Sequence, residues 1–254
     1  MAPWLILMKK WLLVLLGWMW SLSVWGSFPV MHAYLACIWL ESHCTNYSQE
    51  DKVAFMCGTL FPDIYHVGVF DRTKTHDSHV NLQDVAACKS PFLSGVKLHS
   101  FVDNERIKFS SKYKTEKFFP ADVPEREYGL MVLEDQCIKP KMDQKFKSHN
   151  WLKRKYDINK EEYAYKASKR YLSFWHYFVY RYFVSEPQDT IQYMYYCSFV
   201  TLACPNSHSV RFFVSLGRCS PIVKKQIKEQ RQDVENYVNA LVSHFQTLFD
   251  GSER

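Results

Sequence analysis

The sequence predicts an all-α protein whose helices form a single multi-helix domain. Helix start and stop signals recur along the chain, whereas the alternating patterns typical of strands are sparse. Hydrophobic residues make up 47% of the 254 residues, which is enough for a sizeable core. No repeat, low-complexity segment or linker divides the chain. We therefore expect one helical domain over residues 27–254, preceded by a leader over residues 1–26.

The leader has the features of a secretory signal peptide. Two lysines precede the apolar run WLLVLLGWMWSLSV, which is too short to span a bilayer comfortably. Val24 and Gly26 suit the positions three and one before a cleavage site, so the mature chain is predicted to begin near Ser27. A secreted or periplasmic protein follows from this prediction. The alternative is an uncleaved signal that anchors the protein in the membrane.

Cysteines and charge limit the classes of function. All eight cysteines follow the predicted cut, in a compartment that permits disulfides, and Cys197 and Cys204 are close enough to link neighbouring helical turns. The chain has no C-x-x-C pair, which argues against a thiolate zinc site and a redox dithiol. The net charge of +6 comes without a dense basic run, so no nucleic-acid partner is expected.

Helix punctuation defines the elements of the first half of the chain. Ser48 with Asp51 resembles a capping box, and Ser90 followed by Pro91 is typical of an N-cap and a first-turn proline. A polar loop over residues 71–81 separates the two. Apolar residues at helical spacing fill the segments around these signals. The helices expected here cover residues 29–44, 48–58, 82–88 and 90–113.

The second half begins after a turn through Pro120 and Pro124, where acids mark the first turn of a further helix. The basic, irregular segment 139–156 is expected to be a solvated loop. The aromatic run Tyr171–Phe183 is expected to be a core helix with its tyrosine hydroxyls in water, because arginines interrupt it. The helices expected here cover residues 125–137, 159–184, 187–203, 207–216 and 220–249.

His99 and Asp103 form the first candidate pair of metal ligands. Their spacing of four puts both side chains on one helical face, within reach of one ion. The segment around them is largely apolar, so both need a partner that offsets their desolvation, and a metal ion is one such partner. The alternative is a pair on the protein surface.

Three further residues offer ligands of the same kind. His32 lies in an otherwise apolar helix, Asp63 follows the helix-stopping Pro62, and His76 lies in the polar loop. Taken singly, they suit a core histidine, a turn acid and an exposed histidine. Together with the pair on the later helix they supply nitrogen and carboxylate oxygen without thiolate, the ligand set of zinc hydrolases.

These motifs resemble the zinc-dependent phospholipase C family, which includes secreted bacterial phospholipases C and clostridial alpha-toxin. The resemblance consists of His32, the sequence GTLFPD ending in Asp63, a Thr-His pair at His76, and G-x-x-x-H-x-x-x-D from Gly95 to Asp103. The G-x-x-F-P-D form is similar to the amino-terminal domain of glycosylphosphatidylinositol-specific phospholipase D. The zinc-dependent single-strand nucleases share the family's all-helical fold.

The resemblance implies a phosphodiesterase of the phospholipase C type that hydrolyses phospholipid head groups, with a phospholipid or membrane surface as its substrate. It implies that His32, Asp63, His76, His99 and Asp103 bind one to three zinc ions. It also makes Asp63 the candidate general base. The alternatives are a nuclease of the same fold and a non-catalytic helical module with a degenerate metal site.

The chain also departs from the family pattern. The family has a further histidine shortly after the position of Asp103, whereas residues 104–112 contain none. A later histidine with a carboxylate four residues on is also missing, because Lys153 stands four residues after His149. The full three-metal cluster is therefore not expected. Glu134 or Asp135 either replaces a missing ligand or is a solvated acid. His66 and His79 are near enough in sequence to support the site from outside, and His176 is expected to be structural.

Overall fold

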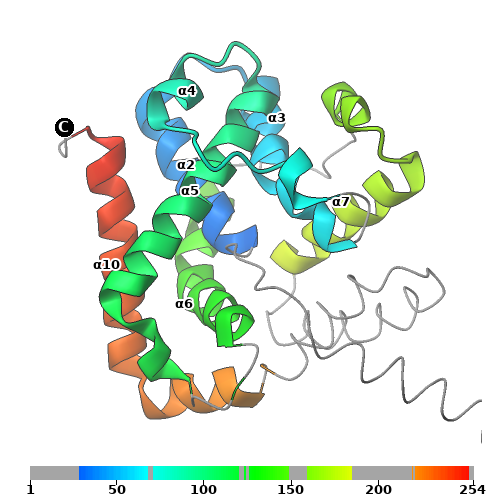
Figure 1. Cartoon of the computed structure of the whole chain (residues 1–254). Helices are drawn as coiled ribbons and strands as arrows, with labels where there is room; N and C mark the ends of the chain where they lie inside the picture. Colours follow the sequence, from blue (N-terminus) through cyan, green and yellow to red (C-terminus); the bar gives the residue numbers. More distant parts are fainter. Residues whose placement is uncertain are drawn as a thin grey trace, which may run out of the picture.

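The computed structural model describes residues 29–67, 71–119, 123, 126–148, 159–184, 219 and 221–251. All regular structure in these residues is helical, and no strand occurs among them, which confirms the predicted all-α class (Figure 1). The predicted signal peptide and the helices expected over 187–203 and 207–216 lie outside the described residues.

The α-helices are α2 (Pro29–His43), α3 (Gln49–Leu60), α4 (Leu82–Ala86), α5 (Pro91–Tyr113), α6 (Arg126–Ser148), α7 (Lys169–Val184) and α10 (Arg231–Phe249). Short 3-10 helices connect them: η1 (Pro62–Val67), η2 (Arg72–Lys74), η3 (Thr115–Phe118) and η5 (Lys160–Tyr165). None of the described helices combines the length and the apolar character needed to cross a bilayer.

The caps predicted from the sequence are confirmed. The Ser48 side chain accepts a hydrogen bond from the backbone of Asp51, whose carboxylate accepts one from the backbone of Ser48, as in a capping box. Ser90 caps α5 by accepting from the Leu93 amide, and Pro91 occupies the first turn. These caps fix where α3 and α5 begin, and therefore which of their residues face one another.

Three predicted boundaries differ from the structure. Residues 139–148, expected to be a loop, are the second half of α6, because Met142 follows the buried Ile138 by one turn and is itself buried. The helix expected over 159–184 is divided into η5 and α7 at Lys166, which adopts a left-handed conformation with φ of 59°. The last predicted helix bends at Gln230, where a segment over 221–229 gives way to α10.

Two glycines allow α3 and α5 to pack in close contact. A Cβ atom on Gly58 would lie 1.9 Å from the Phe92 carbonyl oxygen, and one on Gly95 would lie 2.1 Å from the Phe55 carbonyl oxygen. Helix α5 runs from α3 and α4 at its start to α6 and α10 at its end (Figure 1). Helix α5 carries His99 and Asp103, two of the predicted metal ligands. Its close contact with α3 brings them near η1, the segment after α3 that carries Asp63.

Candidate metal site

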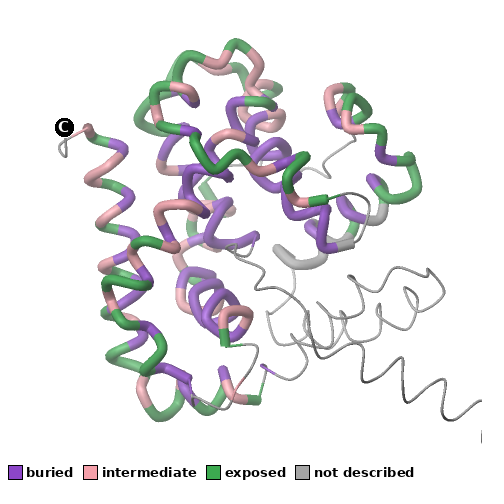
Figure 2. Tube along the Cα trace, in the orientation of Figure 1, coloured by how far each residue is buried: buried purple, intermediate pink, exposed green. Residues whose placement is uncertain are grey.

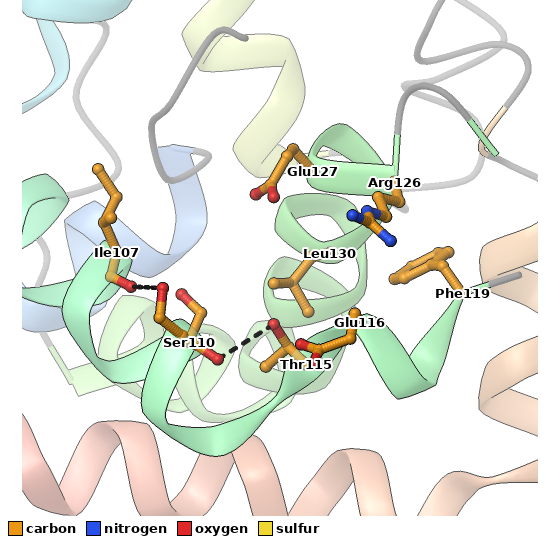
Figure 3. A pocket seen from close by; sticks show the side chains of 9 residues that line it. Ile107, Ser110, Thr115, Glu116, Phe119, Arg126, Glu127 and Leu130 are labelled. Atoms are coloured by element: carbon orange, nitrogen blue, oxygen red, sulfur yellow. Dashed lines mark hydrogen bonds between the residues drawn. The ribbon is translucent and has the colours of Figure 1, made fainter. Parts of the chain in front are cut away.

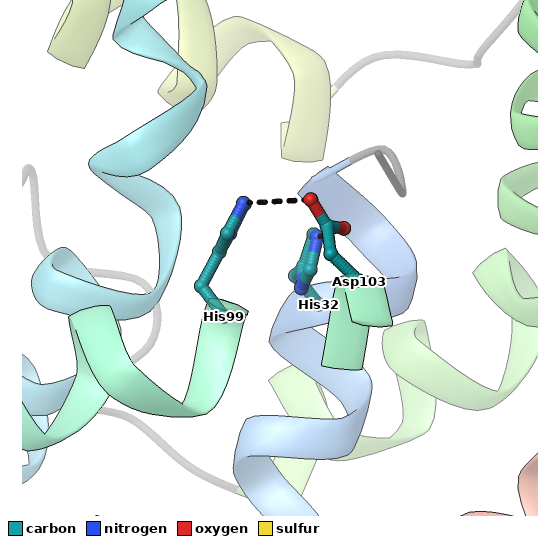
Figure 4. Close-up of side chains that lie close together, drawn as sticks. All are labelled: His32, His99 and Asp103. Carbon is teal, nitrogen blue, oxygen red and sulfur yellow. Dashed lines mark ion pairs between the residues drawn. The ribbon is translucent and has the colours of Figure 1, made fainter. Parts of the chain in front are cut away.

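The structure brings the five predicted ligands together in the protein interior. His32 comes from α2, Asp63 from η1, His76 from the chain just after η2, and His99 and Asp103 from adjacent turns of α5. Two overlapping groups have ligand atoms within 4.8 Å of one another: His32, His99 and Asp103, and Asp63, His76 and His99. The first group is drawn in Figure 4. Residues 71 positions apart in the sequence thus share one cluster.

Asp103 lies at the centre of three histidines. Its Oδ1 is 3.2 Å from Nε2 of His32, and its Oδ2 is 3.4 Å from Nε2 of His76. The Nε2 of His99 is 3.6 Å from the same Oδ2, along the dashed line of Figure 4, and 3.6 Å from Oδ1 of Asp63. Three imidazole nitrogens and two carboxylates therefore point into one small volume, as in protein zinc sites.

The hydrogen bonds of His99 fix which of its nitrogens can bind a metal ion. Its Nδ1 lies 2.8 Å from the Thr59 carbonyl oxygen, which can only accept, so Nδ1 carries the proton and Nε2 of the neutral ring carries a lone pair. That Nε2 is 3.0 Å from Nε2 of His76, whose Nδ1 lies 3.0 Å from the Thr75 hydroxyl and 3.3 Å from the Arg72 carbonyl oxygen. In the tautomer with the proton on Nδ1 of His76, two lone pairs face each other and a cation relieves their repulsion; in the other tautomer, Nε2 of His76 donates to His99.

Some polar atoms of the cluster have no hydrogen bond within the described part of the chain. Nδ1 of His32 and Oδ1 of Asp63 are buried and make no hydrogen bond, whereas Nε2 of His32 has Oδ1 of Asp103 at 3.2 Å. The His32 ring stacks on His99 with centroids 3.8 Å apart and an angle of 15° between the rings. Buried polar atoms without a partner cost free energy. The donor set and these unsatisfied atoms fit a metal ion.

Burial controls the protonation of the cluster. It lowers the pKa of His99 well below the usual value, assisted by the neighbouring His32, and it lowers the pKa of His76. Burial opposes the ionisation of Asp103, but the adjacent His99 and the other histidines around it hold its pKa well below the usual range. Neutral imidazoles and an ionised carboxylate are the forms that bind metal ions.

Asp63 differs from Asp103 in its electrostatics. Burial, together with the nearby charge of Asp103, raises the pKa of Asp63 well above the usual value. A dication beside Asp63 would favour its ionised form instead, because the charge of a bound ion dominates its surroundings. A bound cation would therefore favour the state in which both carboxylates are ionised.

Sequence reasoning did not identify Arg72, which supplies a positive charge at the edge of the cluster. Its Nη2 lies 2.6 Å from Oδ2 of Asp103, and its guanidinium lies over the Tyr65 ring at 5.9 Å. The side chain is 33% exposed, so it connects the buried cluster to solvent. Its only sequence signal is its proximity to His76, because an arginine in a polar loop has no distinctive spacing.

The two histidines proposed to support the site from outside have different positions. His66 is buried, with Nε2 3.8 Å from Oδ1 of Asp63, and therefore borders the cluster. His79 is exposed, and its backbone amide donates to Asp77. His176 is buried and pairs with Glu162 at 2.8 Å, in agreement with a structural role.

Glu134 is a buried residue, and the prediction that it is a solvated acid is wrong. Its carboxylate accepts hydrogen bonds from Nε of Arg106 at 2.7 Å and from the Tyr237 hydroxyl at 2.5 Å. The charge of Glu134 raises the pKa of Arg106 against the opposing effect of burial. This network joins α5, α6 and α10, and Glu134 belongs to neither group of candidate ligands.

Asp135 is also buried rather than solvated. Its Oδ2 accepts from the Val30 amide at 3.1 Å and its Oδ1 accepts from the Met31 amide at 2.8 Å. It therefore caps the first turn of α2 from the neighbouring helix α6, where the helix dipole favours a negative charge. Asp135 positions the helix that carries His32 and lies outside both groups of candidate ligands.

None of the described cysteines belongs to the candidate metal groups. They are Cys37, Cys44, Cys57, Cys88, Cys137 and Cys219. No disulfide joins any two of these six, and the pair considered at Cys197 and Cys204 lies outside the described residues. The candidate ligands in the described residues are therefore histidine nitrogens and aspartate oxygens, without a thiolate.

A pocket of about 270 Å³ lies elsewhere, between the end of α5 and the start of α6 (Figure 3). Its walls include Glu116, Phe119, Arg126 and Glu127. A hydroxyl in the pocket, that of Thr115, is bonded to a backbone carbonyl, as Figure 3 shows. None of the five predicted ligands lines this pocket, which is separate from the metal cluster.

Searches against protein-family models, curated proteins and solved structures found no match. The resemblance to zinc-dependent phospholipases C therefore rests on the short sequence motifs and on the site that they form.

Proposed function

We propose that the protein is a zinc-dependent phosphodiesterase of the phospholipase C type. One observation carries this proposal: the Nε2 atoms of His76 and His99 face each other at 3.0 Å beside two buried carboxylates. Zinc takes such nitrogen and oxygen ligands. His99 has one nitrogen free to bind a metal ion, and both candidate groups need it, so we assign the cluster a single zinc ion.

When bound, zinc supplies Lewis-acid chemistry, which polarises a phosphoryl oxygen and lowers the pKa of a bound water. His32, His99 and Asp103 would hold it, with His76 within reach and Asp63 beside it, so that a coordination position is left for water. Helices α2, η1 and α5 hold four of these residues, His76 follows η2, and Asp135 caps α2.

Asp63 is proposed to be the general base. Its Oδ1 accepts no hydrogen bond in the described structure and so is able to take a proton from water. Pro62 ends the preceding helix and fixes the backbone just before it, which holds this carboxylate at the boundary of the cluster.

Arg72 is proposed to bind the phosphate of the substrate. Its Nη2 contacts Asp103, whereas its Nε has no hydrogen-bond partner within the described residues. A guanidinium presents several donors in one plane and matches phosphate oxygens. The Arg72 side chain is partly exposed, so a substrate phosphate can reach this positive charge from solvent.

The proposed substrate is a phospholipid at a membrane surface, and the proposed location is outside the cytoplasm after cleavage near Ser27. The test compares Asp63→Asn with the parent protein and with His79→Ala, a control at an exposed histidine. Turnover of phospholipid micelles should fall about 10²-fold or more in Asp63→Asn, with zinc content largely retained, as for a lost general base. The control should match the parent protein.

Three other outcomes would contradict the proposal. Full activity of Asp63→Asn with a lowered melting temperature would make Asp63 a turn residue. Cleavage of single-stranded DNA but not phospholipid would identify a nuclease of the same fold. Bound zinc without turnover of either substrate would identify a non-catalytic module.

A further inference from the structure

Exposed aromatic side chains occur along η5 and α7. The large hydrophobic residues that are exposed in the described structure include Tyr163 (47% exposed), Tyr171 (36%) and Tyr177 (44%). The fourth is Leu93 at the start of α5. Figure 2 shows exposed positions along η5, and they include Lys160, Tyr163 and Ala164. Three tyrosines thus face solvent within fifteen residues of sequence.

The 3-10 geometry of η5 aligns its exposed side chains. Residues three apart in a 3-10 helix lie above one another, and Lys160 and Tyr163 follow this spacing. Both are exposed, as is Lys166, which ends the helix in a left-handed conformation. Glu162 and Tyr165 follow the same spacing on another side, where Glu162 is buried and Tyr165 packs on Phe61 at 4.7 Å. One row of η5 therefore faces water and another faces the protein.

The charge of this surface is positive. Within residues 159–184, every charged side chain described as exposed is basic, namely those of Lys160, Lys166, Lys169 and Arg170. The acids of this segment are turned toward the protein. Glu161 accepts from the Ser90 hydroxyl at 2.6 Å, and Glu162 lies 2.8 Å from Nε2 of His176. Both acids are hydrogen-bonded to other parts of the protein, whereas the lysines and the arginine are exposed to solvent.

The elements that carry this surface pack against the chain around Asp63. Asn159 and Glu162 form a capping box at the start of η5. Helix α7 packs against η1, the element that carries Asp63. Tyr165 of η5 packs on Phe61, two residues before Asp63. A partner bound to this surface would therefore lie close to the cluster.

We propose that the basic and aromatic surface of η5 and the start of α7 binds the anionic interface of a phospholipid bilayer. Tyrosines favour the head-group level, because the ring is apolar and the hydroxyl remains wet. Lysine and arginine next to them are attracted to anionic head groups. This binding needs no metal ion, so it is measurable independently of the proposed catalysis.

The test is sedimentation of the full chain with lipid vesicles in the presence of a chelator. Vesicles of phosphatidylcholine alone are compared with vesicles that also contain phosphatidylserine. The double variant Lys160→Ala/Lys169→Ala removes two exposed lysines of the surface. The matched control, Lys224→Ala/Lys228→Ala, removes two exposed lysines from the helix over 221–229. The two variants have the same net charge, so a difference between them is due to position.

Binding is expected to require phosphatidylserine and to weaken with salt. The surface variant should bind roughly 25-fold more weakly, since each basic residue near an anionic membrane contributes about fivefold. The control should bind like the parent protein. Tyr163→Ser, at an exposed position, should weaken binding severalfold without changing the melting temperature.

Equal binding by the surface variant and the control would overturn the proposal, as would equal binding to both kinds of vesicle. Self-association of the parent protein that the surface variant abolishes would assign the surface to a second copy of the chain instead. Vesicle binding is measured with a chelator, so it does not depend on catalysis. If the chain binds vesicles but shows no phosphodiesterase activity when zinc is supplied, only the proposed function is refuted.

Discussion

The substitution Gly95→Ala tests whether the contact between α3 and α5 builds the candidate site. The added Cβ would lie 2.1 Å from the Phe55 carbonyl oxygen and 2.7 Å from the Thr59 amide nitrogen. These are backbone atoms of α3, which cannot rotate away as a side chain can. Because non-bonded heavy atoms prefer about 3.5 Å, the two helices must separate by about 1 Å.

Overpacking of a core costs about 1–3 kcal/mol, and a clash with backbone belongs at the upper end of this range. The better helix propensity of alanine offsets up to about 1 kcal/mol. We expect a net loss of about 2 kcal/mol in the free energy of unfolding, which for a chain of this size lowers the melting temperature by roughly 4–8 °C. His99 follows Gly95 by one turn, so its 2.8 Å bond to the Thr59 carbonyl should also be lost.

Thermal unfolding and zinc titration of the refolded variant measure both effects. Gly129→Ala is the matched control, because the atoms nearest its Cβ belong to the ring of Phe119, a side chain that is able to shift. The control should lose less stability and retain its affinity for zinc. A Gly95→Ala variant with the melting temperature and zinc affinity of the parent protein would refute this account of the helix contact.

Two further substitutions test the buried carboxylates of α6. Asp135→Ala leaves two first-turn amides of α2 without this acceptor, so the free energy of unfolding in denaturant titrations should fall by about 2–4 kcal/mol. Zinc affinity should also fall, because α2 carries His32. Unchanged stability would contradict the capping role. Glu134→Gln leaves Arg106 as an uncompensated buried charge and should cost about 3 kcal/mol, with zinc stoichiometry retained. Loss of zinc on refolding of that variant would instead place Glu134 among the ligands.

The local signals in the sequence predicted much of the fold. Capping residues such as Ser48 and Ser90 act within a few positions of themselves, so their helices were predictable without tertiary contacts. The segment 139–148 was mispredicted because its many lysines are typical of a loop. The burial of Met142 outweighs that composition, and this burial depends on neighbouring helices that the segment's own sequence does not reveal.

The candidate site was predictable where spacing or motif carried information. The spacing of His99 and Asp103 places both on one face of α5. The sequence motif that ends in Asp63 led us to expect this residue in the same cluster, where it lies 3.6 Å from His99. The partners of Glu134 were not predictable, because Arg106 and Tyr237 lie 28 and 103 positions away and show no pattern. The same holds for Asp135, whose contacts with α2 span more than 100 positions.

The most direct test of the central claim is the zinc content of the purified chain after removal of metal and reloading. We predict a single tightly bound zinc ion per chain in the parent protein, because both candidate groups depend on one nitrogen of His99. His99→Ala should bind almost none while remaining helical by circular dichroism, and His79→Ala, at an exposed histidine, should bind as much as the parent protein. Equal zinc in all three proteins, or none in the parent protein, would contradict the assignment of this cluster as a metal site.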